Sequence, residues 1–391
     1  MSNSFKTFLK HTAKDFHNQS VNPPVVRAST IIFKSMKDIR KTQAKAIKNP
    51  TGGHYDYGRQ GTSTTYILQK ILTKLEESYH VFTTPTGFGA VFLAIFSVTR
   101  PGDEIIVADP VYSPTRILTE NFLKEFNIKT TFYDPHDLKT LEKSITKKTK
   151  LIFVENPGSN SFDFQDLGKI VSIAKNHKIL TVMDNTWGTP YFLKPIKLGF
   201  DMAIVSATKY YSGHSDVMGG SLAVNKKVFP KVKAAERITG LRLGPDDAYL
   251  ITRGLRTLDV RLDRHRENAK KVAEFLSKNK KFKLLYPYKK DSYNFRMWKK
   301  YYSGASGLMG VQIKSKNVNS IRKFVNSLKL FGYGYSWGGF ESLALHQEFR
   351  ETGKRKYLKL KKDEHLVRFH IGLEDPSDLI ADIKQALKHL K

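Results

Sequence analysis

The chain has 391 residues, of which 40% are hydrophobic and 26% charged, an ordinary globular composition that is long enough for two domains. It has no cysteine, no apolar run long enough to span a bilayer and no secretory signal in its first 20 residues. This excludes disulfides, thiolate metal sites and a cysteine nucleophile, and it indicates a cytoplasmic protein. The net charge of +30 is spread along the chain without a zinc finger, an aromatic RNA-binding motif or a basic arm, so we expect no nucleic-acid partner and no membrane partner.

Residues 1–60 are expected to form an arm or loop rather than a folded unit. Pro23 and Pro24 interrupt the first part, and the stretch 52–61 is rich in glycine and tyrosine. Such residues favour turns and extended chain over regular structure.

Between residues 61 and 255, short apolar runs alternate with helical patterns. The runs of strand length are 81–84, 104–108, 129–133, 151–155, 179–183 and 202–206. This alternation predicts an α/β fold, with a mostly parallel sheet and helices on both faces. Sites in such sheets gather at the carboxyl ends of the strands, where Asp109, Glu155, Asp184 and Lys209 stand.

The remaining residues, 256–391, are expected to form a smaller C-terminal α+β domain. A long charged helical pattern covers 259–276, and strand candidates follow at 310–313 and 367–371.

Lys209 follows the apolar run 202–206 and precedes a Gly-His-Ser turn. Burying an ammonium group costs free energy unless it finds a partner or loses its charge. One reason to place a lysine there is that a desolvated amine can condense with a carbonyl, and Ser206 and Thr208 could then donate hydrogen bonds to a phosphate. Taken alone, however, this lysine is better explained as one that extends from a strand end into solvent.

Three other segments are compatible with a phosphorylated pyridine ring. Asp184 could keep the ring nitrogen protonated, although it could equally cap a helix. Gly87 and Phe88 open an expected helix and offer backbone N–H groups to an anion, but the third glycine position of a dinucleotide fingerprint is Phe92, which excludes a Rossmann dinucleotide site. Tyr112 could stack on a planar ring or simply pack.

In this order along the chain, these residues resemble the cystathionine-metabolising branch of the fold-type I pyridoxal-phosphate enzymes, specifically the bacterial cystathionine β-lyases. The resemblance extends from residues 21–30 to 367–379, and its most specific part is the active-lysine signature at 206–220. It implies an aminotransferase-like fold and pyridoxal 5′-phosphate as cofactor, bound as a Schiff base to Lys209.

The same resemblance assigns roles around the cofactor. Asp184 pairs with the ring nitrogen and Tyr112 stacks on the ring. The residues implied to hold the phosphate are Gly87, Phe88, Ser206 and Thr208. Tyr57 and Arg59 resemble the family's Tyr-x-Arg, which reaches the phosphate in a neighbouring subunit, so the resemblance implies a dimer with shared sites and usually a tetramer.

The resemblance also indicates the branch and the substrate contacts. Ser336 and Trp337 begin a Ser-Trp-Gly-Gly stretch like that of the β-lyases, where γ-synthases and γ-lyases usually carry Ser-Leu-Gly-Gly. Arg368 lies in a segment like the one whose arginine binds the substrate α-carboxylate. The residues implied to contact substrate are Tyr57, Tyr112, Ser336, Trp337 and Arg368.

The implied reaction is β-elimination of L-cystathionine to L-homocysteine, pyruvate and ammonia, a step of methionine biosynthesis. Lys209 would remove the Cα proton, and Lys209 or Tyr112 would protonate the departing thiolate. Reprotonation of the same carbanion on its other face would racemise a small amino acid such as alanine, so racemase activity stays open. A γ-lyase or γ-synthase, which moves the electrons one carbon further, also stays open.

A serine hydrolase is the alternative from another class of enzyme. Ser336 is the centre of a Gly-x-Ser-x-Gly match, and Asp363 and then His365 or His370 follow in the order of a catalytic triad. The match lies late in the chain and leaves Lys209 unexplained, so it is the weaker hypothesis. The histidines have no paired ligand spacing, and no metal is expected.

Overall fold

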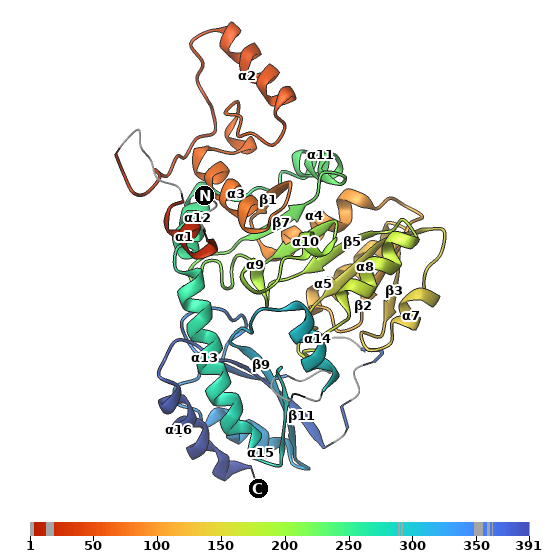
Figure 1. Cartoon of the computed structure of the whole chain (residues 1–391), viewed down its shortest axis with the longest axis vertical. Helices are drawn as coiled ribbons and strands as arrows, with labels where there is room; N and C mark the ends of the chain where they lie inside the picture. Colours follow the sequence, from red (N-terminus) through yellow and green to blue (C-terminus); the bar gives the residue numbers. More distant parts are fainter. Residues whose placement is uncertain are drawn as a thin grey trace.

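The computed structural model describes residues 4–12, 19–287, 290, 292–347, 355–357, 360–361 and 363–390. The N-terminal part of these contains α1 (Phe5–Lys10), α2 (Met36–Lys48) and the short helix η1 (Gly58–Gln60). Helix α2 has no buried residue and projects away from the rest of the molecule (Figure 1). The sequence predicted an arm or loop here and no helix in it; within this part, Ser35 caps the 13-residue α2 by accepting a hydrogen bond from the Asp38 N–H.

Seven strands form the larger sheet in the order β1-β7-β6-β5-β4-β2-β3. They are β1 (His80–Thr84), β2 (Glu104–Ala108), β3 (Lys129–Tyr133), β4 (Thr149–Glu155), β5 (Leu180–Asp184), β6 (Met202–Val205) and β7 (Gly220–Val224). Strands β2 to β6 pair in parallel, and β7 runs antiparallel to both β1 and β6. The predicted mostly parallel sheet is confirmed. Strand β7 was not predicted, because its Gly-Ser-Leu-Ala-Val sequence is weak in β-branched and aromatic residues.

Two apolar layers cover the faces of this sheet. In β4, Ile152 belongs to one buried cluster with residues of α8, while Phe153 belongs to the other with residues of α4 and α11. Alternate residues of a strand point to opposite faces, so a sheet covered on both sides reads as a continuous apolar run. The helices are α3 (Ser63–Leu75), α4 (Gly87–Val98), α5 (Ser113–Ile117), η2 (Leu118–Phe122), α6 (Leu123–Glu125), α7 (Leu138–Lys143), α8 (Leu167–Asn176), α9 (Thr189–Phe192), α10 (Pro195–Leu198), α11 (Phe229–Thr239) and α12 (Pro245–Leu255).

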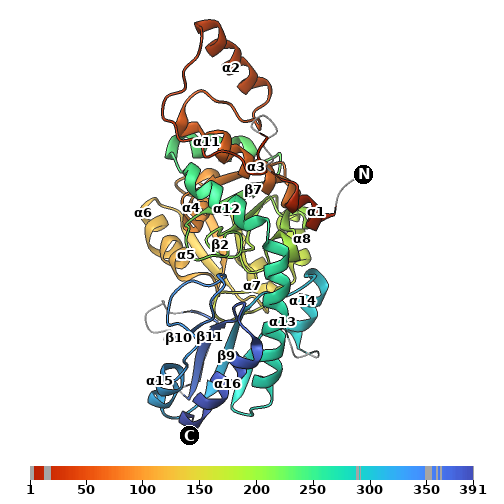
Figure 2. The ribbon, with the colours of Figure 1, turned by 90° about the vertical axis from the view of Figure 1, so that its left-hand side faces the viewer.

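A second, antiparallel sheet lies toward the C-terminus, with the order β10-β11-β9-β8. Helix α13 extends from the larger sheet to this one, and Figure 2 shows the same arrangement from the side. The elements are α13 (Leu258–Ser277), β8 (Phe282–Leu285), α14 (Tyr293–Tyr301), β9 (Leu308–Lys314), α15 (Val318–Asn326), β10 (Leu343–Gln347), β11 (Glu364–His370), α16 (Pro376–Ala386) and η3 (Leu387–His389). The expected smaller α+β unit is present.

Candidate active site

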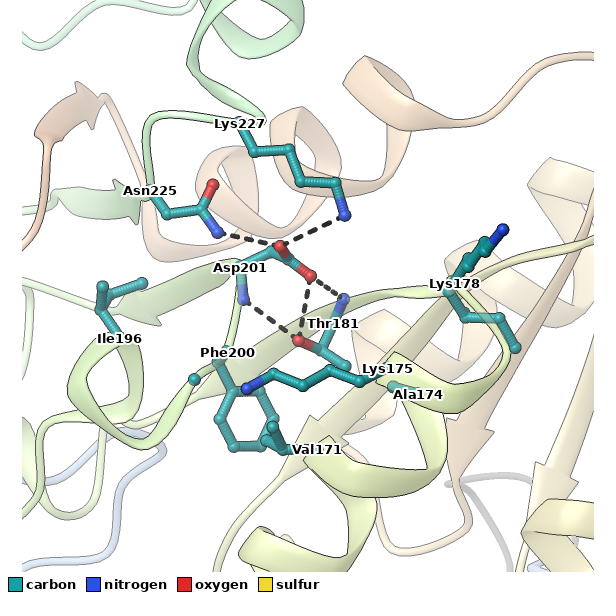
Figure 3. Close-up of a pocket in the computed structure, with 12 residues that line it drawn as sticks. Val171, Ala174, Lys175, Lys178, Thr181, Ile196, Phe200, Asp201, Asn225 and Lys227 are labelled. Carbon is teal, nitrogen blue, oxygen red and sulfur yellow. Dashed lines mark hydrogen bonds and ion pairs between the residues drawn. The ribbon is translucent and has the colours of Figure 1, made fainter.

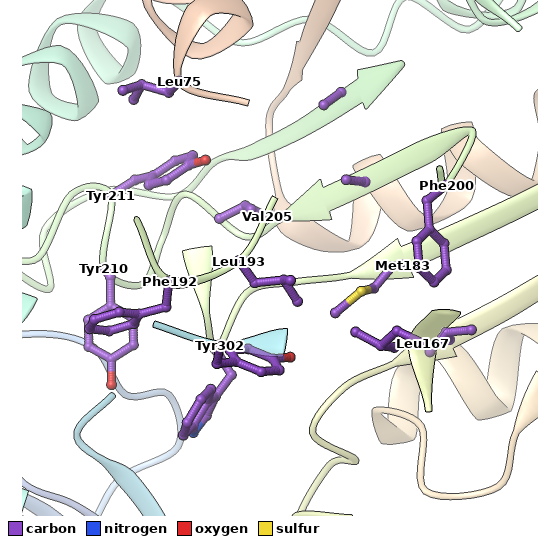
Figure 4. Packing of buried hydrophobic residues seen from close by; sticks show 14 of the residues in the cluster. Leu75, Leu167, Met183, Phe192, Leu193, Phe200, Val205, Tyr210, Tyr211 and Tyr302 are labelled. Carbon is purple, nitrogen blue, oxygen red and sulfur yellow. The ribbon is translucent and has the colours of Figure 1, made fainter. Parts of the chain in front are cut away.

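Lys209 lies at the carboxyl edge of the larger sheet, in the turn that follows β6. The turn is anchored on both of its sides. Tyr210 and Tyr211 are fully buried in the core cluster shown in Figure 4, and the Gly213 N–H donates to the Lys209 carbonyl at 2.9 Å. The backbone of Lys209 is therefore fixed, and its side chain extends toward the C-terminal sheet.

The amine of Lys209 meets a loop that comes from between α15 and β10. Its Nζ donates a hydrogen bond to the Ser336 Oγ at 2.5 Å and lies 5.4 Å from the centre of the Trp337 ring. Burial lowers the pKa of Lys209 from 10.5 to about 8; the positive charge of Arg368 acts in the same direction and Asp184 against it. A neutral amine is therefore accessible near neutral pH.

Asp184 ends β5, the neighbour of β6 in the sheet. The backbone N–H and hydroxyl of Thr186 both donate to its Oδ1, at 2.9 and 2.6 Å. The Thr186 hydroxyl in turn accepts a hydrogen bond from the Ser206 N–H at 2.9 Å. The carboxylate is thus held by the chain that also positions Ser206. Burial raises the pKa of Asp184, against the hydrogen bonds from Thr186 and the charge of Lys209.

The N-terminus of α4 lies against Ser206. A Cβ at position 87 would collide with the Ser206 Oγ, so Gly87 is required for this close approach. The first i to i−4 bond of the helix is from the Ala90 N–H to the Thr86 carbonyl, which leaves the N–H groups of Gly87 and Phe88 ahead of it. Such a helix start beside a serine hydroxyl suits a phosphate.

Tyr112 has a half-exposed ring, and its backbone is held by the side chain of Glu155. Its backbone N–H donates to the Glu155 Oε2 at 2.6 Å. Burial, followed by the charges of Glu155 and Asp184, raises the pKa of the Tyr112 phenol, so this group stays protonated at neutral pH. From the sequence, Glu155 was only a polar residue at a strand end. Its contact with Tyr112 arises because the loop between β2 and α5, which carries Tyr112, passes over the end of β4.

Arg368, on β11, lies close enough to Lys209 for its charge to act on the lysine amine. Its Nη2 donates to the carbonyls of Ser336 and Gly334, at 3.0 and 3.3 Å. Ser336 has a φ of +82°, a backbone conformation that is costly for a residue with a side chain. The larger sheet and the C-terminal unit thus meet where Arg368, Ser336 and Lys209 lie together.

Tyr57 and Arg59 are placed differently from the other predicted site residues. Arg59 donates to the Arg237 carbonyl on α11, and its guanidinium lies 5.8 Å from the centre of the Tyr57 ring. Among the interactions of the described residues, none joins Tyr57 or Arg59 to Lys209 of the same chain.

The structure contradicts the serine-hydrolase alternative. Ser336 bonds to the amine of Lys209, not to a histidine. The ring of His365 lies against the Ser315 carbonyl at 3.2 Å, and that of His370 is bonded to Gly338 and Gly339. The residues fall in the right order along the chain, but among the described interactions none joins either histidine to the Ser336 hydroxyl.

A hollow of about 420 Å³ lies elsewhere, at the amino ends of β5 and β6 (Figure 3). Its Asp201 carboxylate accepts hydrogen bonds from Thr181 and Asn225 and pairs with Lys227 at 4.0 Å. Because Lys209 and Asp184 stand at the carboxyl ends of the same strands, this hollow is on the opposite edge of the sheet.

No described group of three acidic, histidine or cysteine side chains could hold a metal ion. Nor is any helix in the described ranges long and apolar enough to cross a bilayer.

The residues present fit pyridoxal phosphate. A lysine with a lowered pKa suits its aldehyde, the half-buried Asp184 carboxylate suits its ring nitrogen, and the start of α4 beside Ser206 suits its phosphate. Together with a mostly parallel sheet, these features define a pyridoxal-phosphate-dependent enzyme. A family model described as Cys/Met metabolism PLP-dependent enzyme matches residues 6–388, and the chain belongs to this family. The expected family, fold and cofactor are confirmed.

Similar proteins carry related but distinct names. The chain is 36% identical over 370 residues to a cystathionine beta-lyase of Bordetella avium, covering 94% of this chain and 92% of that protein. It is 35% identical over 379 residues to an L-alanine/L-glutamate racemase of Wolbachia pipientis wMel, covering 95% and 93%. The crystal structure of cystathionine gamma synthase from Xanthomonas oryzae pv. oryzae superposes with a TM-score of 0.89 at 28% identity, covering 100% of this chain and 99% of that one.

Proposed function

We propose that this enzyme is a carbon–sulfur lyase that breaks the Cβ–S bond of L-cystathionine and, with the uptake of one water, gives L-homocysteine, pyruvate and ammonia. The observation that carries the proposal is the position of Trp337, whose ring centre lies 5.4 Å from the Lys209 Nζ. Tryptophan at this point is the feature by which the sequence resembles β-lyases. The cystathionine beta-lyase of Bordetella avium supports the same choice.

Arg368 binds the substrate α-carboxylate in this proposal. A guanidinium that already donates to the Ser336 carbonyl is held in one orientation, and a planar donor pair matches a carboxylate. Burial lowers the pKa of Arg368 from its ordinary value, but an arginine remains charged. The substrate is thereby oriented with its Cα toward Lys209.

Lys209 acts as the base. When bound, pyridoxal phosphate supplies an electron-accepting ring that stabilises negative charge at Cα. Asp184 keeps a proton on the ring nitrogen. The neutral amine of Lys209 takes the Cα proton, and the Tyr112 phenol or the protonated Lys209 delivers a proton to the departing sulfur.

The active site is proposed to be shared between two subunits. Tyr57 and Arg59 lie beside α11 of their own chain, so their proposed contact with phosphate and substrate is with the partner's site. Arg59 would add a bidentate charge to the phosphate site formed by Gly87, Phe88, Ser206 and Thr208. A pair of such dimers would form a tetramer.

Racemisation is the second candidate activity. Lys209 and Tyr112 both border the site and carry exchangeable protons, and the relative from Wolbachia is named an L-alanine/L-glutamate racemase. If the two side chains approach Cα from opposite faces, they could invert alanine. Cleavage or synthesis at the γ carbon is the third candidate, in line with the similar γ-synthase structure.

Product analysis distinguishes these activities. The purified holoenzyme is incubated with L-cystathionine and, separately, with L-alanine, and products are identified by mass spectrometry and chiral chromatography. Homocysteine with pyruvate is the expected result. Cysteine with 2-oxobutyrate would move the reaction to the γ carbon, and D-alanine without cleavage of cystathionine would replace the lyase by a racemase. Lys209→Ala should abolish turnover and the absorbance of the lysine-bound cofactor.

A further inference from the structure

Two histidines lie buried behind the turn that carries Ser336 and Trp337. His265 belongs to α13 and His370 ends β11, and their ring centres are 5.1 Å apart. Both side chains are almost fully shielded from solvent, with exposed fractions of 0% and 1%. The proposed reaction uses neither of them.

His370 is bonded to the backbone of the turn. The Gly338 N–H donates to its Nε2 at 3.1 Å, and the Gly339 carbonyl is at the same distance from this nitrogen. Nε2 can accept from the Gly338 N–H or, in the other tautomer, donate to the Gly339 carbonyl, so in either tautomer it is this nitrogen that contacts the turn. The turn is thus attached to β11 through one ring nitrogen.

His265 holds the strand end from which His370 projects. Its Nδ1 lies 2.8 Å from the Ile371 carbonyl, and because a carbonyl only accepts, Nδ1 carries the proton. The Nε2 of His265 and the Nδ1 of His370 are both buried without a hydrogen-bond partner among the described residues. Each ring is therefore bonded to a backbone group through its other nitrogen, and the two rings are in contact without being hydrogen-bonded to each other.

The turn fixed in this way lies directly on Lys209. Gly338 has a φ of +91°, and a Cβ added there would be 3.0 Å from the backbone of Lys209. The Trp337 ring packs on Tyr210 with centres 5.5 Å apart. Because the Ser336 Oγ is 2.5 Å from the Lys209 Nζ, a shift of the turn would open the amine to water.

We propose that His265 and His370 are positioning residues, an uncharged imidazole pair that holds the turn Ser336–Gly339 against Lys209. The inference rests on the proposed role of Lys209 but not on the identity of the substrate. Burial supports the uncharged state, since it lowers the pKa of His265 to about 4 and that of His370 well below its ordinary value.

The consequence is measurable on Lys209. Its pKa of about 8 is due mainly to burial, and the charged groups that act on it are Arg368 and Asp184. If the turn moves away, water reaches the amine and the burial that is the main cause of its lowered pKa is lost, so the pKa should rise toward 10.5.

Paired substitutions test the role of each ring nitrogen. A glutamine amide reaches the position of Nε2 and an asparagine amide that of Nδ1. His370→Gln and His265→Asn should therefore keep the Lys209 pKa, whereas His370→Asn and His265→Gln should raise it by about one unit or more. The pKa is measured on the full-length protein freed of cofactor, from the pH dependence of labelling of Lys209 by an amine-specific reagent, read by peptide mass spectrometry.

Gly338→Ala gives a second route that leaves both histidines intact. It should raise the Lys209 pKa in the same way, because the added Cβ displaces the turn. Equal values in the Gln and Asn variants at each position, or a Lys209 pKa unchanged in all five proteins, would overturn the proposal. Thermal unfolding identifies variants that fail to fold, and these are excluded from the comparison. A failure to cleave cystathionine would leave this result unaffected and would count only against the proposed function.

Discussion

Glu155 and Asp184 are register partners on the neighbouring strands β4 and β5, so two half-buried acidic residues stand side by side at the carboxyl edge of the sheet. Burial raises the pKa of Glu155 well above its ordinary value, and the charge of Asp184 acts in the same direction. Two adjacent carboxylates rarely both ionise in such surroundings. Glu155 is therefore expected to hold a proton, which leaves Asp184 to carry the negative charge under the cofactor ring.

Glu155→Gln should accordingly be tolerated. Glutamine keeps an acceptor for the Tyr112 N–H, and it is as neutral as the protonated acid it replaces. Turnover at pH 7 should stay within about threefold of the parent enzyme, while Asp184→Asn should lose about a hundredfold or more and weaken cofactor binding. Equal losses in the two variants, measured as kcat/KM, would mean that Glu155 works as an ionised group.

Glu76 makes stability depend on pH. It is fully buried, accepts a hydrogen bond from the Tyr211 hydroxyl at 2.9 Å, and its pKa is raised by burial from 4.5 to about 7. A raised acid pKa favours the folded state at low pH, and this contribution is fully present below pH 4.5 and lost as the pH rises through 7. Glu76→Gln should therefore be more stable than the parent at pH 8, by up to about 3 kcal/mol, and equal to it near pH 4.5.

The neighbouring Glu77 provides the control for this measurement. It is exposed, and the pKa of its carboxyl is lowered by the hydrogen bond from Lys194. Stability is measured by unfolding in urea. At pH 8, Glu77→Gln should lower the urea midpoint slightly, whereas Glu76→Gln should raise it. If Glu76→Gln were less stable than the parent at pH 8, the carboxylate would have a partner that stabilises its charge.

How much the sequence could predict depended on how far apart along the chain two interacting residues lie. Strands β2 and β3 have the predicted bounds because each is an apolar or β-branched run. The strand-end rule also brought Asp184 and Lys209 to one edge. The contact of Ser336 with Lys209 joins residues 127 positions apart, and only the resemblance to a family suggested it.

The two histidines illustrate what the sequence could not show. His265 and His370 looked like scattered residues because no local spacing links α13 to the end of β11. Their importance lies in which ring nitrogen meets which backbone group, and that depends on tertiary packing. Helix α2 escaped prediction for another reason. Its sequence is amphipathic and Ser35 is a typical N-cap residue, so both signals were present, but the prolines and glycines on either side favoured an irregular arm.

Arg368→Lys should weaken substrate binding more than it slows turnover. Lysine keeps the charge but loses the planar donor pair, and it cannot also reach the Ser336 carbonyl. We expect KM for L-cystathionine to rise about 10- to 100-fold, the equivalent of losing one or two hydrogen bonds to a charged group. Arg253→Lys, at an exposed position of α12, is the control and should leave KM unchanged. A fall in kcat with KM unchanged would assign Arg368 to the chemical step instead.

Mixed oligomers test whether the site is shared. Lys209→Ala and Arg59→Ala should each be inactive alone, because one lacks the base and the other the proposed contact with the partner's phosphate. When the two chains are co-expressed in equal amounts with different tags, half of the dimers are hybrids in which one of two sites is intact, so activity should return to about a quarter of the parent value. The control pairs Lys209→Ala with Ser206→Ala. Both of these residues belong to the same chain's half of the site, so a hybrid repairs neither defect and no activity should return. No recovery in the test pair when both tags copurify would place Arg59 in the site of its own chain, whereas recovery in the control would mean that the assay does not report complementation between half-sites.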